Sequence, residues 1–381
     1  MWRSVAVAAA VGGAFTFGVV TGVVGSRGSG SGVLDQAAAQ IASTAARPVD
    51  RDALDRAAVE GMLSTLGDRW SSYYTPGQYR TFQDSLSGRY SGVGLWLRPG
   101  PKAGQPVRIA SVAPGSPAAE SGVLPGDVLL AVDGQVTRSA SVGDVVGWLR
   151  GDDGTQVTLT LRRDGSVQTV TLTRRSLVTQ DVSVEQLSGG ILAIRVHAFT
   201  RGVGRQVRDA LAADPAAHRG GVILDLRGNP GGLLDEGVEV ASAFLNGGPV
   251  VSYERRGAPD KVLQATPGGD TTTPLAVLVD GSSASAAEVV AAALQDRGRA
   301  VIVGQRTYGK GSVQEPFRLQ DGSALELTVG KYLTPSGRSI DGRGVEPDIL
   351  IPDGSAPEVA QDRAVEVLRG LMAALPLGPQ G

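Results

Sequence analysis

Short apolar runs alternate with segments of helical spacing between residues 177 and 352, and this pattern constrains the fold of the 381-residue chain most strongly. Such runs, bounded by turn residues, predict buried strands. Helices between consecutive strands are typical of an α/β layer with a mainly parallel sheet. The predicted strands are 191–196, 222–226, 275–279, 300–303 and 325–329, and the predicted helices are 204–213, 233–245 and 285–296.

A compact β-rich module is predicted before this layer, at residues 88–176. Asp164-Gly165 separates two of its strand-like runs, and this dipeptide favours a hairpin turn. The predicted strands are 93–97, 107–112, 128–132, 157–161 and 167–172, with a short helix at 141–149.

The N-terminal region, residues 33–87, has helical spacing. One apolar stripe runs from Leu34 to Ala45, and a second runs from Leu54 to Leu66. Another amphipathic helix is predicted in the tail, residues 353–381. These terminal helices are candidates for self-association into a homo-oligomer.

The first 32 residues predict a membrane segment followed by a flexible linker. The uncharged run at 4–26 has about the length that a bilayer core requires, roughly 20 residues. It is longer than a typical signal-peptide core, so we expect an uncleaved anchor, with a cleaved signal peptide as the alternative. The rest of the chain is then expected outside the cytoplasm, anchored to the cell membrane or secreted.

Composition excludes several classes of function. The formal net charge is -2, whereas a nucleic-acid binder usually carries a basic excess. Cysteine is absent, which excludes disulfides, thiolate metal ligands and a cysteine nucleophile. The two histidines, His197 and His218, lack metal-site spacing, so a catalytic zinc site is not expected. Chemistry by side chains alone, as considered below, requires no metal and no cofactor, and we expect neither.

Ser285 is the first candidate catalytic residue, because it follows a predicted strand and begins a predicted helix. Ligand sites in α/β folds lie beyond strand ends, and free backbone N–H groups at a helix start suit an oxyanion. The alternative is structural, since Ser285 and Glu288 have the spacing of a capping box. The two interpretations are compatible.

Lys310 is the candidate base, because it lies between two glycines and a buried neutral lysine can accept a proton. Gln314 could orient its amine. One alternative is an ordinary solvated lysine. Another is a phosphate loop, because residues 304–310 read G-x-x-x-x-G-K, but Gly311 replaces the usual serine or threonine.

The run DLRGNPGG at 225–232 also follows a predicted strand. Turn formation explains much of it, yet its paired glycines expose N–H groups that could form half of an oxyanion hole. A Ser-His-Asp site that uses His197 or His218 remains an alternative, which would make the chain a histidine-based serine hydrolase.

Taken together, these motifs resemble the C-terminal processing peptidases, also called tail-specific proteases. The resemblance extends from about residue 57 to residue 352, and the order and spacing of the motifs are specific. One departure is Ala287, where the family often has serine. The motifs that carry the family resemblance are GMLSTLGDRWSSYYTP at 61–76, GVGLWL at 92–97, APGSPAAESGVLPGDVLLAVDG at 113–134, LRGDDGT at 149–155, DLRGNPGG at 225–232, GSSASAAE at 281–288, ALQDRGRAVIVGQRTYGKGSVQ at 293–314 and GVEPDI at 344–349.

The resemblance implies a crotonase-like (ββα-type) α/β protease core at 177–352, an inserted PDZ domain and an N-terminal helical segment. It implies a Ser-Lys dyad of Ser285 and Lys310, assisted by Gln314. It further implies an oxyanion hole from the N–H groups of Ala286 and Gly231. The PDZ domain implies recognition of the C-termini of protein or peptide substrates, with the loop residues Gly92, Val93, Gly94 and Leu95.

Two expectations are less specific. Arg150, near the end of the PDZ-like module, is a candidate regulatory residue, although an exposed arginine is usually only a surface cation. The chain could also be a catalytically silent PDZ scaffold, but it retains the serine, the lysine and the glutamine.

Overall fold

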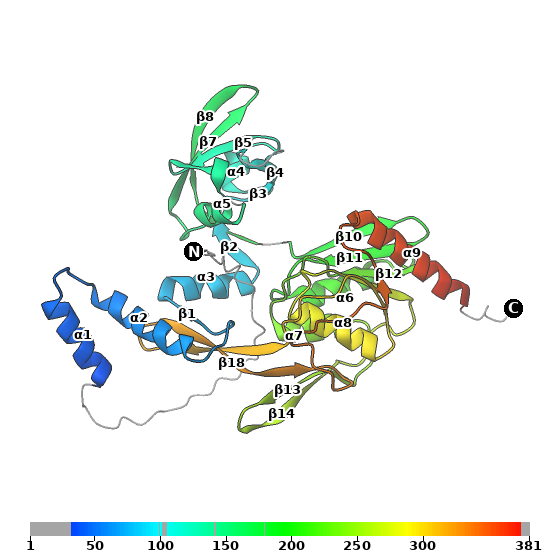
Figure 1. The fold of residues 1–381 in the computed structure, drawn as a ribbon. Helices are drawn as coiled ribbons and strands as arrows, with labels where there is room; N and C mark the ends of the chain where they lie inside the picture. Colours follow the sequence, from blue (N-terminus) through cyan, green and yellow to red (C-terminus); the bar gives the residue numbers. More distant parts are fainter. Residues whose placement is uncertain (1–31, 99, 101–104, 141, 179, 375–381) are drawn as a thin grey trace. The chain divides into compact units, whose positions relative to one another are not determined.

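The protein divides into two units, which we describe separately. The structure is a computed structural model that describes residues 32–98, 100, 105–140, 142–178 and 180–374. Among these, residues 81–178 and Gln180 belong to one unit, while residues 32–80 and 181–374 belong to the other (Figure 1). The membrane segment expected at 4–26 lies outside the described residues. No helix in the described part of the chain is long and apolar enough to cross a bilayer.

A six-stranded sheet forms the centre of the larger unit. Its strand order is β10-β11-β12-β15-β16-β19; β10 is antiparallel to β11, and the other neighbours are parallel. The mainly parallel sheet predicted from the alternation is therefore confirmed. These strands are β10 (Val182–Leu187), β11 (Ile191–Val196), β12 (Gly221–Asp225), β15 (Leu275–Val279), β16 (Val301–Gly304) and β19 (Ile349–Leu350).

Helices cover both faces of this sheet. Alternate residues of β11 and β12 belong to different cores, as the two-residue period of a strand requires. Leu192 and Leu224 pack with three helices, whereas Ile191 and Ile223 pack with α9. The three helices are α6 (Val203–Ala213), α7 (Leu234–Ser242) and α8 (Ala286–Asp296), and α9 is Pro357–Ala374.

A second sheet, antiparallel, corrects two sequence predictions. The run at 325–329 was predicted within the parallel layer, but it belongs to the long strand β18 of this second sheet. The region 33–87 was predicted as helical, but Ser72–Tyr74 forms strand β1, which pairs with β18. Period-two alternation over three residues is too short to detect in sequence. The sheet contains β1, β13 (Pro249–Arg255), β14 (Ala258–Gln264), β17 (Ser312–Arg318) and β18 (Ala324–Leu333).

Two helices precede β1 and contribute little to the core. Helix α1 (Val33–Thr44) buries Ala38, and α2 (Arg51–Ser64) buries no residue. Much of both apolar stripes is therefore exposed, including Ile41 and Met62. A third helix, α3 (Pro76–Leu86), follows β1 and leads into the smaller unit.

The smaller unit has a β-rich core, as the sequence predicts. The hairpin of β7 and β8 turns at Asp164-Gly165, both at positive φ, so the predicted turn is confirmed. Its elements are β2 (Arg89–Gly92), β3 (Leu95–Arg98), β4 (Arg108–Val112), α4 (Pro117–Glu120), β5 (Val128–Val132), β6 (Gln135–Val136), η1 (Thr137–Ser139), α5 (Val142–Leu149), β7 (Gln156–Arg163), β8 (Ser166–Thr173) and β9 (Arg175–Val178).

Candidate active site

Ser285 lies on a strained turn between β15 and α8. Its backbone angles are φ 55° and ψ -117°, a region that residues other than glycine rarely occupy. The residue is fully buried, and its Oγ has no hydrogen-bond partner among the described residues. Strained backbone of this kind is concentrated at functional sites, where the surrounding structure enforces it.

Glu288 explains how this turn is held. The Ser285 N–H donates to Glu288 Oε2 at 2.9 Å, which is the glutamate half of a capping box. The serine half does not form, because the Ser285 side chain makes no cap hydrogen bond. The hydroxyl therefore remains available for chemistry while the turn is still capped.

The same carboxylate fixes the lysine loop. Glu288 Oε1 accepts from the Gly309 N–H at 2.7 Å and from the Thr307 hydroxyl, while Oε2 accepts from the Lys310 N–H at 2.8 Å. Burial raises the pKa of Glu288 despite these four donors. One buried side chain on α8 thus joins the segment that carries Ser285 to the segment that carries Lys310.

Lys310 is 3% exposed, and an aromatic side chain covers it. Its Nζ lies 4.7 Å from the ring centroid of Trp70, whose ring also packs edge-on against Tyr308 at 6.1 Å. Burial lowers the pKa of Lys310, and the charges of Glu326, Glu288 and Asp68 oppose that shift. A lowered pKa is what a lysine base requires.

Ser285 and Lys310 do not form a hydrogen bond between their side chains in this conformation, since Ser285 Oγ has no partner. Catalytic hydrogen bonds are often long or absent without substrate and shorten only in the complex. The backbone anchoring by Glu288 nevertheless keeps the two segments in a fixed relation.

Gln314 lies on β17 and is 2% exposed. Its Nε2 donates to Ser312 Oγ at 2.7 Å and to Thr328 Oγ1 at 3.2 Å. Its Oε1 is buried and has no partner among the described residues, so it is free to accept a hydrogen bond from an amine. The role predicted for Gln314 stays a prediction, but its acceptor is available.

Gly231 packs directly against the Ser285 turn, since an added Cβ would lie 2.8 Å from Ser285 Cβ. Its N–H, however, donates to Asn229 Oδ1 at 2.8 Å. To serve an oxyanion, this amide must share or leave that bond. Ala286 begins α8, where helix geometry gives the amide no intrahelical acceptor. Both predicted donors therefore flank Ser285, and only the Gly231 amide is already engaged.

Asp280 ties this glycine turn to the serine turn. Its Oδ1 accepts from the Gly228 N–H at 3.0 Å and from the N–H groups of Ser282 and Ser283.

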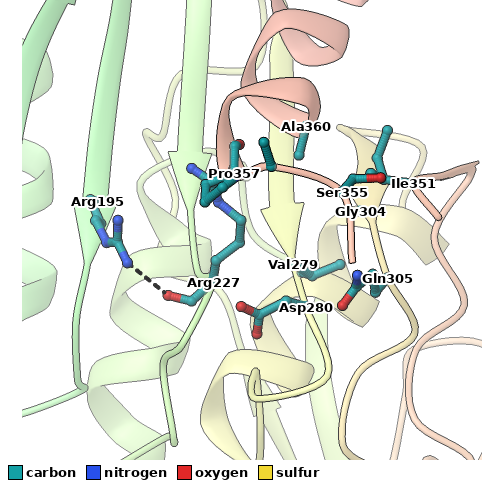
Figure 2. Close-up of a pocket in the computed structure, with 11 residues that line it drawn as sticks. Arg195, Arg227, Val279, Asp280, Gly304, Gln305, Ile351, Ser355, Pro357 and Ala360 are labelled. Atoms are coloured by element: carbon teal, nitrogen blue, oxygen red, sulfur yellow. Dashed lines mark hydrogen bonds between the residues drawn. The ribbon is translucent and has the colours of Figure 1, made fainter. Parts of the chain in front are cut away.

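Asp280 also lines a cavity of about 310 Å³ at the carboxyl ends of the parallel strands (Figure 2). In that cavity Arg227 is paired with Asp225 and Arg195 donates to the Arg227 carbonyl at 3.4 Å. The dyad residues do not line this cavity.

The predicted PDZ loop joins β2 to β3. Gly94 has φ +80°, and its Cα lies so close to Ser116 that an added Cβ would clash at 2.2 Å. The Val93 carbonyl accepts from the Ala118 N–H at 3.0 Å.

Arg150 is exposed just after α5, and its predicted regulatory role stays a prediction.

The histidine alternative gains no support from the site geometry. Burial lowers the pKa of His197, whose Nε2 lies 3.3 Å from Ser183 Oγ on the neighbouring strand. His218 is buried in the loop before β12, and its Nδ1 has no partner in the described part of the chain. Neither histidine contacts Ser285 through a hydrogen bond among the described residues.

Sequence reasoning missed Trp70, whose ring covers the lysine, Glu326, whose charge acts on it, and Tyr74, which bonds Glu326. Trp70 immediately precedes β1, Tyr74 ends β1, and Glu326 lies in β18. The antiparallel pairing of β1 with β18 brings together residues that are 250 positions apart in sequence. The aromatic run RWSSYY at 69–74 is the signal in the sequence for these residues, but it falls within a region whose apolar spacing favours helix.

Comparison with known proteins identifies the family of the chain. The model of peptidase family S41 matches residues 190–351, and a PDZ domain model matches residues 108–163. The chain is 34% identical over 308 residues to a "Probable CtpA-like serine protease" of Staphylococcus aureus, covering 79% of this chain and 61% of that protein. It is 36% identical over 312 residues to the chloroplastic carboxyl-terminal-processing peptidase 2 of Arabidopsis thaliana, covering 77% of this chain and 60% of that one.

Solved structures give the same result. The photosystem II D1 C-terminal processing protease has a TM-score of 0.55 at 30% identity, covering 85% of this chain and 88% of that chain. An S41 protease of Bacteroides fragilis shares the fold, with a TM-score of 0.57 at 19% identity. The match covers 82% of this chain and 90% of that protein's chain. The chain spans about 60% of the length of the curated relatives. From these matches, the chain belongs to the C-terminal processing peptidases of family S41, with a PDZ domain.

Proposed function

We propose that this chain is a serine endopeptidase that uses a Ser-Lys dyad. The observation that carries the proposal is the shared anchoring of the Ser285 and Lys310 amides on the buried carboxylate of Glu288. The lowered pKa of Lys310, caused by burial, and the unbonded Ser285 hydroxyl support it. The protease core is then a variant of the crotonase-like ββα fold.

In the proposed reaction Lys310 Nζ accepts the proton of Ser285 Oγ as that oxygen bonds to the carbonyl carbon of the scissile peptide. The tetrahedral oxyanion accepts from the Ala286 N–H and from Gly231, whose amide exchanges its bond with Asn229 for the oxyanion. Lys310 returns the proton to the leaving amine, which departs and leaves an acyl-enzyme. Lys310 then takes a proton from the water that attacks the ester and gives it to Ser285 Oγ as the ester C–O bond breaks, which releases the carboxylic acid and restores the neutral lysine. Gln314 Oε1 orients the amine throughout.

The substrates we propose are proteins that present a free C-terminus. A PDZ domain binds an extended tail as an added strand and holds its carboxylate on loop N–H groups. The glycine-rich loop of Gly92 to Leu95 would supply those groups. Given the apolar segment at 4–26, we propose that the enzyme acts outside the cytoplasm, held at the cell membrane or secreted.

We also propose self-association through α1 and α2. Their apolar stripes are exposed, with Ile41 of α1 44% and Met62 of α2 51% accessible. Burying such residues against a second copy would remove apolar surface from water. Sedimentation of the Met62→Glu variant should show a smaller assembly than that of the wild-type chain.

The proposed peptidase function is tested with two peptides that differ only at the C-terminus, one with a free apolar tail and one with an amidated tail. Wild type should cleave the free-tail peptide faster, and the Ser285→Ala variant should cleave neither. A silent PDZ scaffold would bind the free tail without cleaving it. A histidine-based hydrolase would lose activity when His197 and His218 are both replaced by alanine.

A further inference from the structure

Glu326 is a buried carboxylate that the mechanism above does not use. It lies within β18, opposite Ser72 of β1, and is only 5% exposed. The Tyr74 hydroxyl donates to its Oε2 at 2.7 Å. A carboxylate is seldom buried without a charged partner, because its desolvation is costly.

The strand register places Glu326 beside the catalytic cluster. On β17 and β18, Gln314 is opposite Thr328, and their side chains share a hydrogen bond of 3.2 Å. Glu326 is two residues from Thr328 on the same strand, so both side chains project from the same face of the sheet. Glu326 therefore lies on the face that carries Gln314.

Residues 68–74, which lead into and form β1, cover the lysine and bond to β18. The Thr328 N–H donates to Ser71 Oγ at 3.1 Å, and the Ser71 hydroxyl donates to Asp68 Oδ2 at 2.6 Å. Trp70, in the same segment, has its ring 4.7 Å from Lys310 Nζ. The segment that covers the lysine thus also carries Tyr74, the hydrogen-bond donor of Glu326.

The charges of three carboxylates act on Lys310: Glu326 on β18, Glu288 on α8 and Asp68 before β1. Glu288 is committed to four donors, and Asp68 accepts from the N–H groups of Trp70 and Ser71 as well as from the Ser71 hydroxyl. Glu326 Oε2 accepts from the Tyr74 hydroxyl. The cation Arg69 lies over the Trp70 ring at 4.5 Å. Of the three carboxylate charges, that of Glu326 acts most strongly on Lys310.

We propose that Glu326, oriented by Tyr74, is the counter-charge of Lys310 and decides the pH at which the lysine becomes a base. It is a positioning residue, since it acts through Lys310. Its catalytic meaning rests on the proposed peptidase function, but the electrostatic coupling does not.

The direction of the coupling follows from the charges. Burial lowers the pKa of Lys310, and the Glu326 charge opposes this more than the other two carboxylates do. Burial raises the pKa of Glu326, while the Tyr74 hydroxyl and the Lys310 charge lower it. Removing the negative charge at Glu326 should therefore make Lys310 lose its proton at lower pH. Removing the Tyr74 hydroxyl should act in the same direction, because Glu326 then protonates more easily.

The lysine can be observed without catalysis. The whole sequence contains four lysines, at positions 102, 261, 310 and 331. Carbon-13 labelling of the lysine ε-carbons in the full chain gives four NMR signals whose shifts follow the charge of each amine. The Lys310→Arg variant identifies the signal of Lys310 by its loss.

We expect Glu326→Gln to lower the titration midpoint of Lys310 by about one pH unit, the lower end of the usual effect of a nearby opposite charge. Tyr74→Phe should produce a smaller shift of the same sign. The matched control is Glu315→Gln on β17, whose partner is Arg255 at 2.8 Å, and it should leave the midpoint unchanged. The acidic limb of kcat/KM should move with the NMR midpoint.

A Lys310 midpoint that stays at the wild-type value or rises in both Glu326→Gln and Tyr74→Phe would overturn this inference. If Glu326→Gln fails to fold, Tyr74→Phe decides the question, because it keeps the carboxylate and removes one hydroxyl. If the chain proves to have no peptidase activity, the proposed function fails, yet the NMR result still confirms or overturns the coupling.

Discussion

Ser285 and Lys310 donate their backbone N–H groups to the same atom, Oε2 of Glu288, at 2.9 and 2.8 Å. The two residues are 25 positions apart in sequence and belong to different loops. A single buried carboxylate therefore holds the backbones of these two loops together. In the dyad we propose, Glu288 would position both residues through their backbones rather than take part in the proton transfer.

Replacing Glu288 with glutamine should reduce kcat by about 10²-fold, because small displacements of reacting groups cost that much. The glutamine amide nitrogen cannot accept hydrogen bonds, so it leaves two of the four donors without a partner. The unfolding free energy should fall by about 1–3 kcal/mol for the same reason. Steady-state kinetics and thermal unfolding measure both effects. Glu346→Gln, which alters an exposed pair with Arg306, is the control and should change neither.

Activity should rise with pH as Lys310 loses its proton, since the ammonium form cannot accept the proton of Ser285. Burial lowers the pKa of Lys310, so the midpoint of kcat/KM should lie below the ordinary lysine value of about 10.4. The measurement is the pH profile of peptide cleavage. A midpoint that disappears in the His197→Ala variant would instead indicate a histidine base.

Trp70→Ala should move this midpoint to higher pH. The indole both buries Lys310 and attracts its ammonium form at 4.7 Å, and these effects have opposite signs. Burial can shift a lysine pKa by about 3–5 units, whereas the cation–π contact is worth about 0.5–2 kcal/mol, so burial dominates. The pH profile of Trp96→Ala, an exposed tryptophan in the PDZ unit, should match that of wild type. A downward shift in Trp70→Ala would show that the cation–π contact dominates.

Gly231→Ala should abolish activity and destabilise the protein. Gly231 has φ +104°, and an added Cβ would lie 2.8 Å from Ser285 Cβ and 2.9 Å from the Ala284 carbonyl oxygen. Gly228→Ala in the same turn is the matched control, because its Cβ would meet nothing within 4 Å despite φ +70°. Backbone strain alone should cost the control about 1–2 kcal/mol. Equal loss of activity in the two variants would remove the argument for close packing at Gly231.

The sequence predicts the local elements and the order of the motifs well. Ser285, Lys310 and Gln314 can be predicted as site candidates because each carries its signal within a few residues, in a strand end, a glycine pair or a short spacing, and their catalytic roles stay predictions. The parallel sheet was also predictable, since buried strands between helices have a strong pattern.

Long-range pairing is what the sequence could not provide. Strand β1 is three residues long, and its partner β18 lies 250 positions away, so no local pattern indicates that Trp70 covers Lys310. The hydrogen bond from the Gly231 N–H to Asn229 Oδ1 could not be predicted from the sequence either, because the direction of the Asn229 side chain depends on the turn. The capping box was half right, since only Glu288 takes part.

Covalent labelling of Ser285 tests the dyad most directly. Wild-type protein incubated at neutral pH with a fluorophosphonate should gain one adduct, which mass spectrometry of the digested chain should place on Ser285. Lys310→Met keeps an apolar side chain of similar length in the buried site and should remain unlabelled, with an unchanged unfolding midpoint. Labelling of Lys310→Met at the wild-type rate would contradict the account, because the serine would then be activated by another base.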